Sequence, residues 1–306
     1  MTKRALITGI TGQDGAYLSK FLIKKGYKVF GALRRTSSIN TSRLSYLGVL
    51  DQIELVPMDL AEITNIQRLI ERIEPDEIYN LAAQSFVQTS YEQPIYTSDI
   101  DGIGVTRLLE TVRNLGGRPK FYQASTSEMF GKAEQSPQNE NTPFYPRSPY
   151  GIAKLYSHWM TVNYREAWNV FACSGILFNH ESPLRGTEFV TRKISQGMAK
   201  IALKKIKQIN LGNLNAERDW GFAGDYVEAM WLMLQKDKPD DYVIATGETN
   251  SVREFVQVAA NSINIDIEWD NEGDSEIGIC KKTGSTIISV DKQYTRPSET
   301  DHLLGD

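Results

Sequence analysis

The chain has 306 residues, of which 41% are hydrophobic and 24% are charged, and its net charge is −4 at pH 7. This length and composition exclude a disordered chain and allow one large hydrophobic core with a smaller lobe. The weak negative charge gives no general attraction to nucleic acid or to an anionic membrane, no apolar run reaches about 18 residues, and no secretory leader precedes the first predicted strand, so we expect a soluble, cytoplasmic protein.

Over the first two thirds of the chain, short apolar runs rich in β-branched residues alternate with longer amphipathic segments. The predicted strands are, in chain order, Arg4–Thr8, Lys28–Leu33, Ile53–Met58, Glu77–Leu81, Lys120–Ser125 and Phe171–Phe178. Helical spacing fills the segments between them and recurs near Phe189–Leu203, Asp225–Leu234 and Val252–Ile263. The polar stretch Lys132–Pro149 is typical of a long functional loop.

This alternation predicts an α/β fold with a Rossmann-like, doubly wound parallel sheet, which binds its ligands beyond the carboxyl ends of the strands. We expect residues 1–178 to form the Rossmann domain. After residue 178 the rhythm breaks, so residues 179–306 are expected to form mainly a smaller C-terminal substrate-binding lobe, although some of its segments can return to the sheet.

The cysteines and histidines predict neither a disulfide nor a metal site. Cys173 and Cys280 lie far apart and outside any CxxC spacing, and the three histidines are scattered. Because Cys173 lies inside an apolar run, we expect it to be a buried thiol.

A glycine-rich motif, Gly9-Ile10-Thr11-Gly12-Gln13-Asp14-Gly15, directly follows the first predicted strand and opens a helix. Glycines at this place permit a tight turn, close approach of the backbone to a pyrophosphate and close packing of helix on strand. The motif therefore predicts a dinucleotide site, with a plain strand-to-helix turn as the alternative.

The end of the second strand distinguishes two cofactors. An acidic residue that binds the ribose 2′-hydroxyl is usual there in NAD-binding proteins, whereas this chain has Arg34-Arg35-Thr36. NADP is therefore favoured over NAD, unless the arginines are merely a solvated basic pair. Asp59 and Leu60 after the third strand, and Leu81, Ala82, Ala83, Gln84 and Ser85 after the fourth, fall where the rest of the cofactor is expected to lie.

Four polar residues suggest the chemistry. Tyr150 and Lys154 lie one helical turn apart, so the ammonium can lower the pKa of the phenol from about 10 and make it a base. Thr126 ends the fifth strand, where its hydroxyl can bind a sugar hydroxyl that is being oxidised. Glu128 follows two residues later, and it leaves the same face if the strand continues, so that it can take and return a carbon-bound proton.

Each of these residues also has an ordinary structural explanation. A surface tyrosine beside a surface lysine occurs by accident in many helices, Thr126 could cap a strand, and Glu128 could be a carboxylate at a helix N-terminus. Their combination with the upstream glycine motif favours the catalytic interpretation.

The chain resembles the extended short-chain dehydrogenases/reductases and, among them, the GDP-mannose 4,6-dehydratase family over nearly its whole length. The stretches that carry the resemblance are ALITGITGQDGAYL, NLAAQS, FYQASTSEMFG, TPFYPRSPYGIAK, VNYREA, GILFNHESPLRG, FVTRKI, LGNLNAERDWG, DYVEAMW and YVIATGET. The resemblance implies tight NADP binding, oxidation of GDP-D-mannose at C4, elimination of water across C5 and C6, and return of the hydride to C6.

By this resemblance Tyr150 is the base for the 4-hydroxyl, Thr126 is its hydrogen-bond partner, Glu128 is the C5 proton acceptor and Lys154 orients the cofactor. Ser127, beside the glutamate, resembles the GDP-mannose enzymes, since the dTDP-glucose enzymes carry an aspartate there. A first step toward deoxysugars such as GDP-fucose and GDP-rhamnose is implied.

The resemblance also implies binding residues. The cofactor set comprises Gly9, Thr11, Gly12, Gln13, Asp14, Gly15, Arg34, Arg35, Thr36, Asp59, Leu60, Leu81, Ala82, Ala83, Gln84, Ser85, Tyr96, Lys154, His180 and Arg185. The substrate set comprises Ser85, Glu128, Asn179, Val190, Lys193, Arg218, Arg253, Arg296 and Glu299. Among its cations we favour Arg218 and Arg253 before Lys193. His158, Tyr164, Tyr226 and the five tryptophans are expected to pack in the core.

Some positions depart from the family. Leu184 stands where many members have arginine, and Phe222 and Asn250 stand where histidine is frequent. The alternatives are a dehydratase of another GDP-sugar such as GDP-manno-heptose, a GDP-4-keto-6-deoxymannose reductase, and a non-catalytic NADP-binding regulator. The Ser- and Thr-rich segment after Arg35 resembles the loop through which this family pairs protomers, which implies a homo-oligomer, a tetramer or a dimer.

Overall fold

The structure is a computed structural model that describes residues 2–294, 298 and 302–306. Two of the expected substrate residues, Arg296 and Glu299, lie outside the described residues. No helix in the described ranges is both long and apolar enough to cross a membrane.

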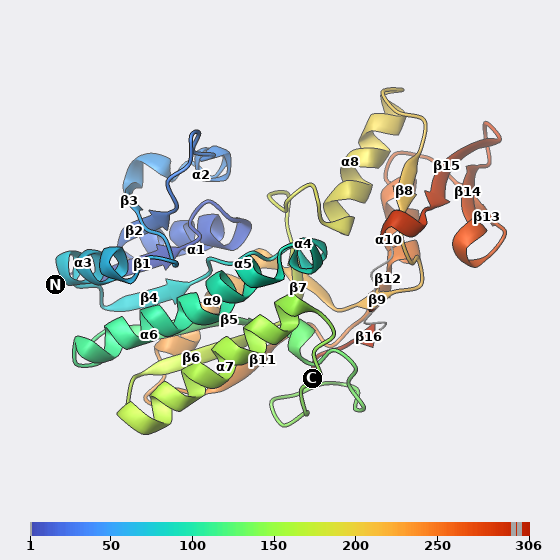
Figure 1. Ribbon diagram of the computed structural model, residues 1–306. Coiled ribbons are helices and arrows are strands. Elements are labelled where there is room, and N and C mark those ends of the chain that lie inside the picture. The colour runs from blue at the N-terminus through green and yellow to red at the C-terminus, as the bar shows by residue number, and fades with distance from the viewer. Residues whose placement is uncertain (1, 295–297, 299–301) are drawn as a thin grey trace.

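A seven-stranded, wholly parallel sheet forms the centre of the larger part of the molecule (Figure 1). Its strand order is β11-β6-β5-β4-β1-β2-β3, in which the order reverses beside β1 as expected for a doubly wound fold. The strands are β1 (Arg4–Thr8), β2 (Lys28–Leu33), β3 (Ile53–Pro57), β4 (Glu77–Asn80), β5 (Lys120–Thr126), β6 (Ala172–Leu177) and β11 (Asp241–Ile244).

Helices cover both faces of this sheet because its strands are apolar on both sides. Ala5 and Ile7 of β1 belong to the core beneath α1 and α9, whereas Leu6 between them belongs to the core beneath α3 and α6. The helices of this part are α1 (Gln13–Lys24), α2 (Ser42–Tyr46), α3 (Ile63–Ile73), α4 (Val87–Glu92), α5 (Pro94–Ser98), α6 (Gly104–Asn114), α7 (Pro149–Trp168) and α9 (Ala223–Leu234). Short 3₁₀ turns occupy η1 (Leu50–Gln52) and η3 (Ser127–Met129), and a π-helical turn, η2 (Asp99–Ile103), joins α5 to α6.

The smaller lobe packs around its own core and lies to one side of the sheet in Figure 1, coloured yellow to red. Its main elements are α8 (Val190–Ala202), α10 (Val252–Asn261), β8 (Ile209–Leu211), β13 (Ile267–Asp270), β14 (Ile277–Cys280) and β15 (Ser285–Val290). The strands β8 and β13 to β15 form one four-stranded sheet. Two small sheets complete the fold, from β7 (Asn179–Glu181), β9 (Glu217–Arg218), β10 (Trp220–Phe222), β12 (Asn250–Ser251) and β16 (His302–Leu303), and two 3₁₀ turns, η4 (Gly273–Ser275) and η5 (Lys292–Tyr294), lie beside β14 and β15.

The predicted strands and helices are confirmed, since every predicted strand end lies within one residue of the observed one. Two segments beyond residue 178 return to the large part: β11 pairs with β6, and α9 packs against α1. Cys173 is fully buried, and its burial raises the pKa of the thiol to about 11, as expected for an inert structural cysteine.

The expectation for the tryptophans is confirmed only in part, since Trp220, Trp231 and Trp269 pack partly buried against the hydrophobic cores. None of the five is fully buried, and Trp159 and Trp168 are 55% and 45% exposed on α7. Tyr164 and Tyr226 are buried as predicted. Tryptophan is large and amphipathic, so its presence in a sequence does not distinguish a core position from a half-covered surface position.

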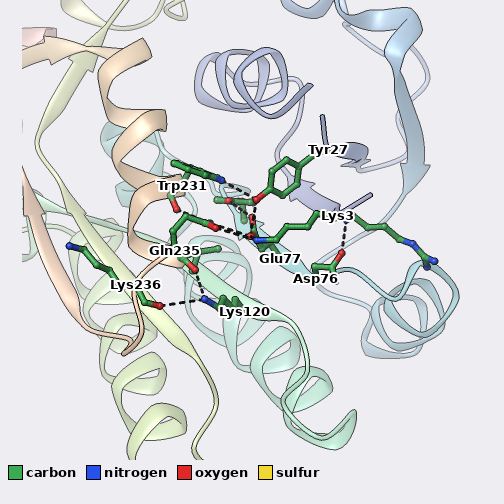
Figure 2. A network of polar contacts seen from close by, with 11 residues as sticks. Lys3, Tyr27, Asp76, Glu77, Lys120, Trp231, Gln235 and Lys236 are labelled. Atoms are coloured by element: carbon green, nitrogen blue, oxygen red, sulfur yellow. Dashed lines mark hydrogen bonds and ion pairs between the residues drawn. The ribbon is translucent and has the colours of Figure 1, made fainter. Parts of the chain in front are cut away.

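A polar network closes the end of the sheet where the strands begin (Figure 2). Glu77 at the start of β4 is buried, and one carboxylate oxygen accepts hydrogen bonds from Lys3 Nζ at 3.0 Å, from the Tyr27 hydroxyl at 3.0 Å and from Gln235 Nε2 at 3.2 Å. The other oxygen accepts from the Tyr79 hydroxyl at 2.7 Å. Both oxygens of this carboxylate are therefore satisfied.

Candidate active site

A continuous cleft follows the carboxyl ends of β1, β4, β5 and β6, where a doubly wound sheet binds its ligands. Its central section is lined by residues from both predicted motifs, including Gly9, Gly12, Gln13, Asp14, Gly15, Ser125, Thr126, Glu128, Tyr150, Lys154, Asn179, His180 and Arg185. The structure thus brings the glycine motif and the four candidate catalytic residues into one site.

The glycine loop leaves space for a phosphate because side chains are excluded from it. Gly9 has a φ of +67°, and a Cβ there would lie 2.9 Å from the backbone nitrogen of Ala82. A Cβ at Gly15 would lie 2.6 Å from the carbonyl oxygen of Gly9. Since α1 begins at Gln13, its free N–H groups face this cradle, which fits the pyrophosphate of a dinucleotide.

A second section of the cleft extends from the glycine loop toward the end of β2. It is lined by Thr11, Arg34, Thr36, Asp59, Leu60, Leu81, Ala82, Ala83, Ser85 and Tyr96, all members of the predicted cofactor set. The Arg34 guanidinium donates to the Tyr96 hydroxyl. Two predicted members do not line the cleft: Arg35 is exposed, and Gln84 turns its amide to the carbonyl of Phe86 and the hydroxyl of Thr97.

The helix α7 presents Tyr150 and Lys154 to the cleft. Its N-terminus is fixed by Ser148, whose hydroxyl accepts from the Gly151 N–H at 3.0 Å. Lys154 is buried and donates to the carbonyl of Ala124 at 2.9 Å, with its nitrogen 5.8 Å from the centre of the Tyr150 ring. The Tyr150 hydroxyl is hydrogen-bonded to Thr126.

The expected lowering of the tyrosine pKa by lysine is wrong for this structure. Burial raises the pKa of Tyr150 well above its usual range, and the charges of Asp101 and Glu128 raise it further, while Thr126 and Arg185 act in the opposite sense. Burial also lowers the pKa of Lys154, against the attraction of Asp101. Desolvation thus outweighs the helical spacing on which the expectation rested.

Thr126 and Glu128 reach the cleft in a different way from the one expected. The strand ends at Thr126 and the chain turns into η3, so the alternation of strand side chains does not relate the two residues. The Thr126 hydroxyl instead accepts from the Glu128 N–H at 3.3 Å. Both side chains are almost fully buried at the wall of the same cleft.

A third section of the cleft lies between the two parts of the molecule. It is lined by the predicted substrate residues Asn179, Val190, Lys193 and Arg218, together with Arg185 and Trp220. Lys193 lies over the ring of Tyr294, 3.3 Å from its centre, and burial lowers the pKa of its ammonium. Clustered cations suit a diphosphate.

Arg253 is not brought to this section. Its guanidinium pairs with the carboxylate of Glu276, donates to Asn215 at 2.8 Å and lies over the Trp269 ring. Of the three cations that we favoured, Arg218 and Lys193 line the cleft and Arg253 does not, so the prediction that Arg253 binds substrate finds no support in this arrangement. His158 is buried beside Ser125 and edge-on to Phe144 and Trp159, consistent with the expected packing role.

Two residues of the site were missed from the sequence. Arg43 of α2 lines the cleft, where it donates to the carbonyls of Thr11 at 3.0 Å and Leu184 at 2.7 Å. Asp101 is fully buried in η2, which packs on α7. An acid between the apolar Ile100 and Ile103 was a usable signal for Asp101, whereas the Ser- and Thr-rich surroundings of Arg43 gave none.

The fold and the site define a class. A doubly wound parallel sheet, a glycine loop after β1 and a Tyr-x-x-x-Lys pair in one cleft are the marks of an extended short-chain dehydrogenase/reductase. Solved structures agree at the level of the fold. The dTDP-glucose 4,6-dehydratase of Streptomyces venezuelae, solved with NAD, superposes with a TM-score of 0.82 at 19% identity, covering 99% of this chain and 88% of that one. A UDP-glucose 4-epimerase of Thermotoga maritima superposes with a TM-score of 0.80 at 20% identity, covering 99% and 89%.

Sequence comparisons identify one family within this class. The family model for GDP-mannose 4,6 dehydratase matches residues 6–306. GDP-mannose 4,6 dehydratase of Homo sapiens is 54% identical over 310 residues, covering 99% of this chain and 83% of the relative, and that of Yersinia enterocolitica is 52% identical over 322 residues, covering 99% and 86%. The chain belongs to the GDP-mannose 4,6-dehydratase family.

Proposed function

We propose that this protein converts GDP-mannose to GDP-4-keto-6-deoxymannose. The observation that carries the proposal is the convergence of Thr126, Glu128, Tyr150 and Lys154 with the glycine loop in one cleft. The substrate is inferred from the family to which the chain belongs, and the cations in the third section of the cleft suit the diphosphate of this substrate.

The residues divide the chemistry into ordered steps. A nicotinamide cofactor held at the glycine loop would supply the hydride acceptor for C4 of the sugar and the hydride donor for C6. Tyr150 in its phenolate form, hydrogen-bonded to Thr126, accepts the proton of the 4-hydroxyl as C4 becomes a ketone. Only then is the C5 proton acidic enough for Glu128 to remove, and Glu128 passes this proton to the departing C6 hydroxyl, which leaves as water. The proton held by Tyr150 is then available for C5, so the atoms balance with no net oxidation.

The test uses purified protein, GDP-mannose and no added reductant. Proton NMR should show loss of the C6 hydroxymethyl signal and appearance of a methyl group beside a C4 ketone or its hydrate. Unchanged GDP-mannose, with cofactor demonstrably bound, would overturn the proposal in favour of another GDP-sugar. Glu128→Gln should lower turnover by about 10³-fold while binding of cofactor and GDP-sugar persists.

We propose NADP rather than NAD as the cofactor. Arg34 lines the cleft at the end of β2, where a guanidinium suits a 2′-phosphate. Dissociation constants measured for both dinucleotides should favour NADP, and Arg34→Leu should reduce that preference. Tighter binding of NAD by the unaltered protein would contradict the assignment.

We also propose a homo-oligomer in which α7 packs against a second copy. Ile152, Tyr156 and Trp159 lie on one side of α7 and are about half exposed, and Ile103 of η2 is similarly exposed beside them. In Figure 1 the helices α5 and α6 follow one another, and α7 lies alongside them and contacts both. Light scattering should give a dimer or tetramer, and Trp159→Glu should reduce its mass. A monomer before substitution would overturn this proposal.

The division of labour between the two parts and the compartment are likewise proposals. Residues 1–178 supply the cofactor and catalytic groups, and residues 179–306 supply mainly substrate contacts. A cytoplasmic location is supported by the two free, buried thiols, Cys173 and Cys280.

A further inference from the structure

The segment His302–Asp306, which we call the clasp, contacts two regions of the site that come from different elements. Its strand β16 pairs in parallel with β9, where Leu303 lies opposite Arg218. The Leu303 side chain is buried in a small core that also contains Met129, the residue after Glu128. In Figure 1, β16 accordingly lies between β9 and the green loop that precedes α7.

Gln138 holds the clasp to the loop between η3 and α7, and it is only 1% exposed. Its backbone donates to the Leu304 carbonyl at 2.7 Å and accepts from the Asp306 N–H at 2.9 Å. Its side-chain oxygen accepts from the Leu304 N–H at 3.0 Å. The end of the same loop packs against the catalytic turn, since a Cβ at Gly151 would lie 2.8 Å from the Glu128 carbonyl oxygen.

Asp219, the residue after Arg218, holds the clasp from the other side and is likewise 1% exposed. Its N–H donates to the Leu303 carbonyl at 3.1 Å, and its carboxylate accepts from the Gly305 N–H at 3.4 Å. The carboxylate also accepts from the backbone N–H of Thr246 at 3.0 Å and from its hydroxyl at 2.7 Å. One buried carboxylate thus joins β9, the clasp and the segment after β11.

Close packing leaves the clasp little room to move. A Cβ at Gly305 would overlap the Ala245 side chain and would lie 3.1 Å from the Phe178 ring. Phe178 itself lines the central section of the cleft, directly before Asn179. The position of the clasp is therefore fixed by contacts on three sides.

The proposed substrate would span two sections of the cleft, with its diphosphate near Arg218 and its hexose beside Glu128 and Tyr150. Arg218 follows Ala216 of the smaller lobe's core, whereas the two catalytic residues belong to the larger part. A displacement of the reacting atoms by about 1 Å can cost about 10²-fold in rate. Contacts that join the two parts beside these residues therefore bear on catalysis.

We propose that the clasp sets the distance between the diphosphate-binding and the catalytic groups, and that Asp219 and Gln138 are its positioning residues. Neither residue lines the three sections of the cleft, so each acts through a neighbour: Asp219 through Arg218, and Gln138 through the loop beside Glu128. The proposal rests on the function proposed above for these neighbours.

Gln138→Leu tests the proposal from the side of the loop, because it removes the side-chain acceptor of the Leu304 N–H at similar volume. We expect kcat/KM for GDP-mannose to fall by about 10²-fold. Dissociation constants for GDP and for the cofactor, measured by calorimetry, should stay nearly unchanged, since neither ligand spans both sections. An unaltered kcat/KM, or GDP binding weakened as much as turnover, would overturn the proposal.

Gln135→Leu is the matched control. It makes the same change on the same loop, but at an exposed side chain whose residue contacts Gln138 only through its backbone carbonyl. Its kcat/KM should equal that of the unaltered protein. An equal loss in this variant would mean that any change on the loop acts alike, and would overturn the specific role of Gln138.

Asp219→Asn releases the clasp from the other side, because an amide cannot accept hydrogen bonds from both Thr246 and Gly305 with its single oxygen. The same result is expected: turnover falls while the affinity for GDP persists. If GDP binding weakened as much as turnover, Asp219 would only hold Arg218 locally, and its proposed role in the clasp would be wrong.

Hydrogen exchange provides a measurement that needs no substrate. In Gln138→Leu, amides should exchange faster in the clasp and also in β9 and η3, because the clasp connects these two elements. Faster exchange confined to the clasp would refute the coupling even if the unaltered protein makes the methyl product. Faster exchange in both elements, without any product from the unaltered protein, would leave the coupling intact and refute the proposed function.

Discussion

A carboxylate is buried at each end of the central sheet, and the two carboxylates differ in how many hydrogen bonds they accept. At the end where the strands begin, Glu77 accepts four hydrogen bonds, from Lys3, Tyr27, Tyr79 and Gln235 (Figure 2). At the end where the strands finish, Asp101 accepts one, from Gln84, and its second oxygen has no partner among the described residues. A satisfied buried acid fastens the fold, whereas an unsatisfied one retains the capacity to respond to protons and charges.

The two ends of the sheet also differ in how closely their glycines pack against neighbouring backbone. Gly9 and Gly26 both have positive φ, at +67° and +82°. Gly9, at the finishing end of β1, lies against the backbone of Leu81 and Ala82, whereas a Cβ at Gly26, before β2, would meet nothing within 4 Å. Close packing at the finishing end brings the backbone within reach of a ligand, and open turns suffice at the other end.

Among the variants that test this comparison, Gly9→Ala is expected to change the free energy of unfolding most. The substitution should reduce the free energy of unfolding by about 3 kcal/mol, from about 1 for the left-handed conformation and about 2 for the overlap with Ala82, and it should weaken cofactor binding. Gly26→Ala should cost only about 1 kcal/mol and leave cofactor binding unchanged. Urea denaturation and cofactor titration measure both, and equal costs would remove the distinction.

A smaller effect is expected from Glu77→Gln at the opposite end. The neutral amide cannot accept all four hydrogen bonds and leaves Lys3 without its counter-charge, so we expect a loss of about 2 kcal/mol in the free energy of unfolding with kcat unchanged. Glu74→Gln, which removes an exposed carboxylate 3.6 Å from Arg4, is the control and should stay within about 0.5 kcal/mol. A fall in kcat for Glu77→Gln at a temperature where it is fully folded would break the comparison.

What the sequence could predict is what depends on neighbours along the chain. The strand patterns, the glycine motif after β1 and the Tyr150–Lys154 spacing are local, and each lies where it was expected. The condition on which Thr126 and Glu128 would share a strand face is not met, because β5 ends at Thr126 and the chain turns into η3, which no local pattern encodes.

What the sequence could not predict depends on distant partners. Arg253 is drawn from the substrate section by Glu276 of the smaller lobe, and the pKa of Tyr150 is set by burial and by Asp101 rather than by the lysine one turn away. Arg43 reaches the cleft only because α2 folds back over the glycine loop. Desolvation and long-range ion pairs are properties of the assembled fold, so spacing rules give no measure of them.

A partly buried acid refines the contrast between the two ends of the sheet. Asp14 lies at the finishing end, yet it is well paired: its Oδ2 lies 2.8 Å from His180 Nε2, while His180 Nδ1 lies 2.8 Å from the Phe178 carbonyl oxygen. Because both partners of the imidazole are acceptors, the ring satisfies them only when both nitrogens carry protons. The Asp14 charge accordingly raises the pKa of His180 against the effect of burial, and His180 lowers that of Asp14.

This pairing predicts the smallest effect, a dependence of stability on pH. A raised histidine pKa gives a contribution that is complete below about pH 6.5 and is lost as the pH rises through the folded-state value, while the lowered Asp14 pKa preserves it down to about pH 4. In cofactor-free protein, the stability advantage over His180→Gln should therefore shrink by about 1 kcal/mol between mildly acidic and mildly alkaline solution.

His158 is the control, and its stability contribution should depend on pH in the opposite direction. Burial lowers the pKa of His158 and the folded state holds its neutral form, so the advantage over His158→Gln should grow as the pH rises toward about 6.5. If urea denaturation gave the same change of unfolding free energy with pH for both variants, the assignment of a charged His180 would be wrong. Asp14 would then be, like Asp101, an acid without a fixed counter-charge.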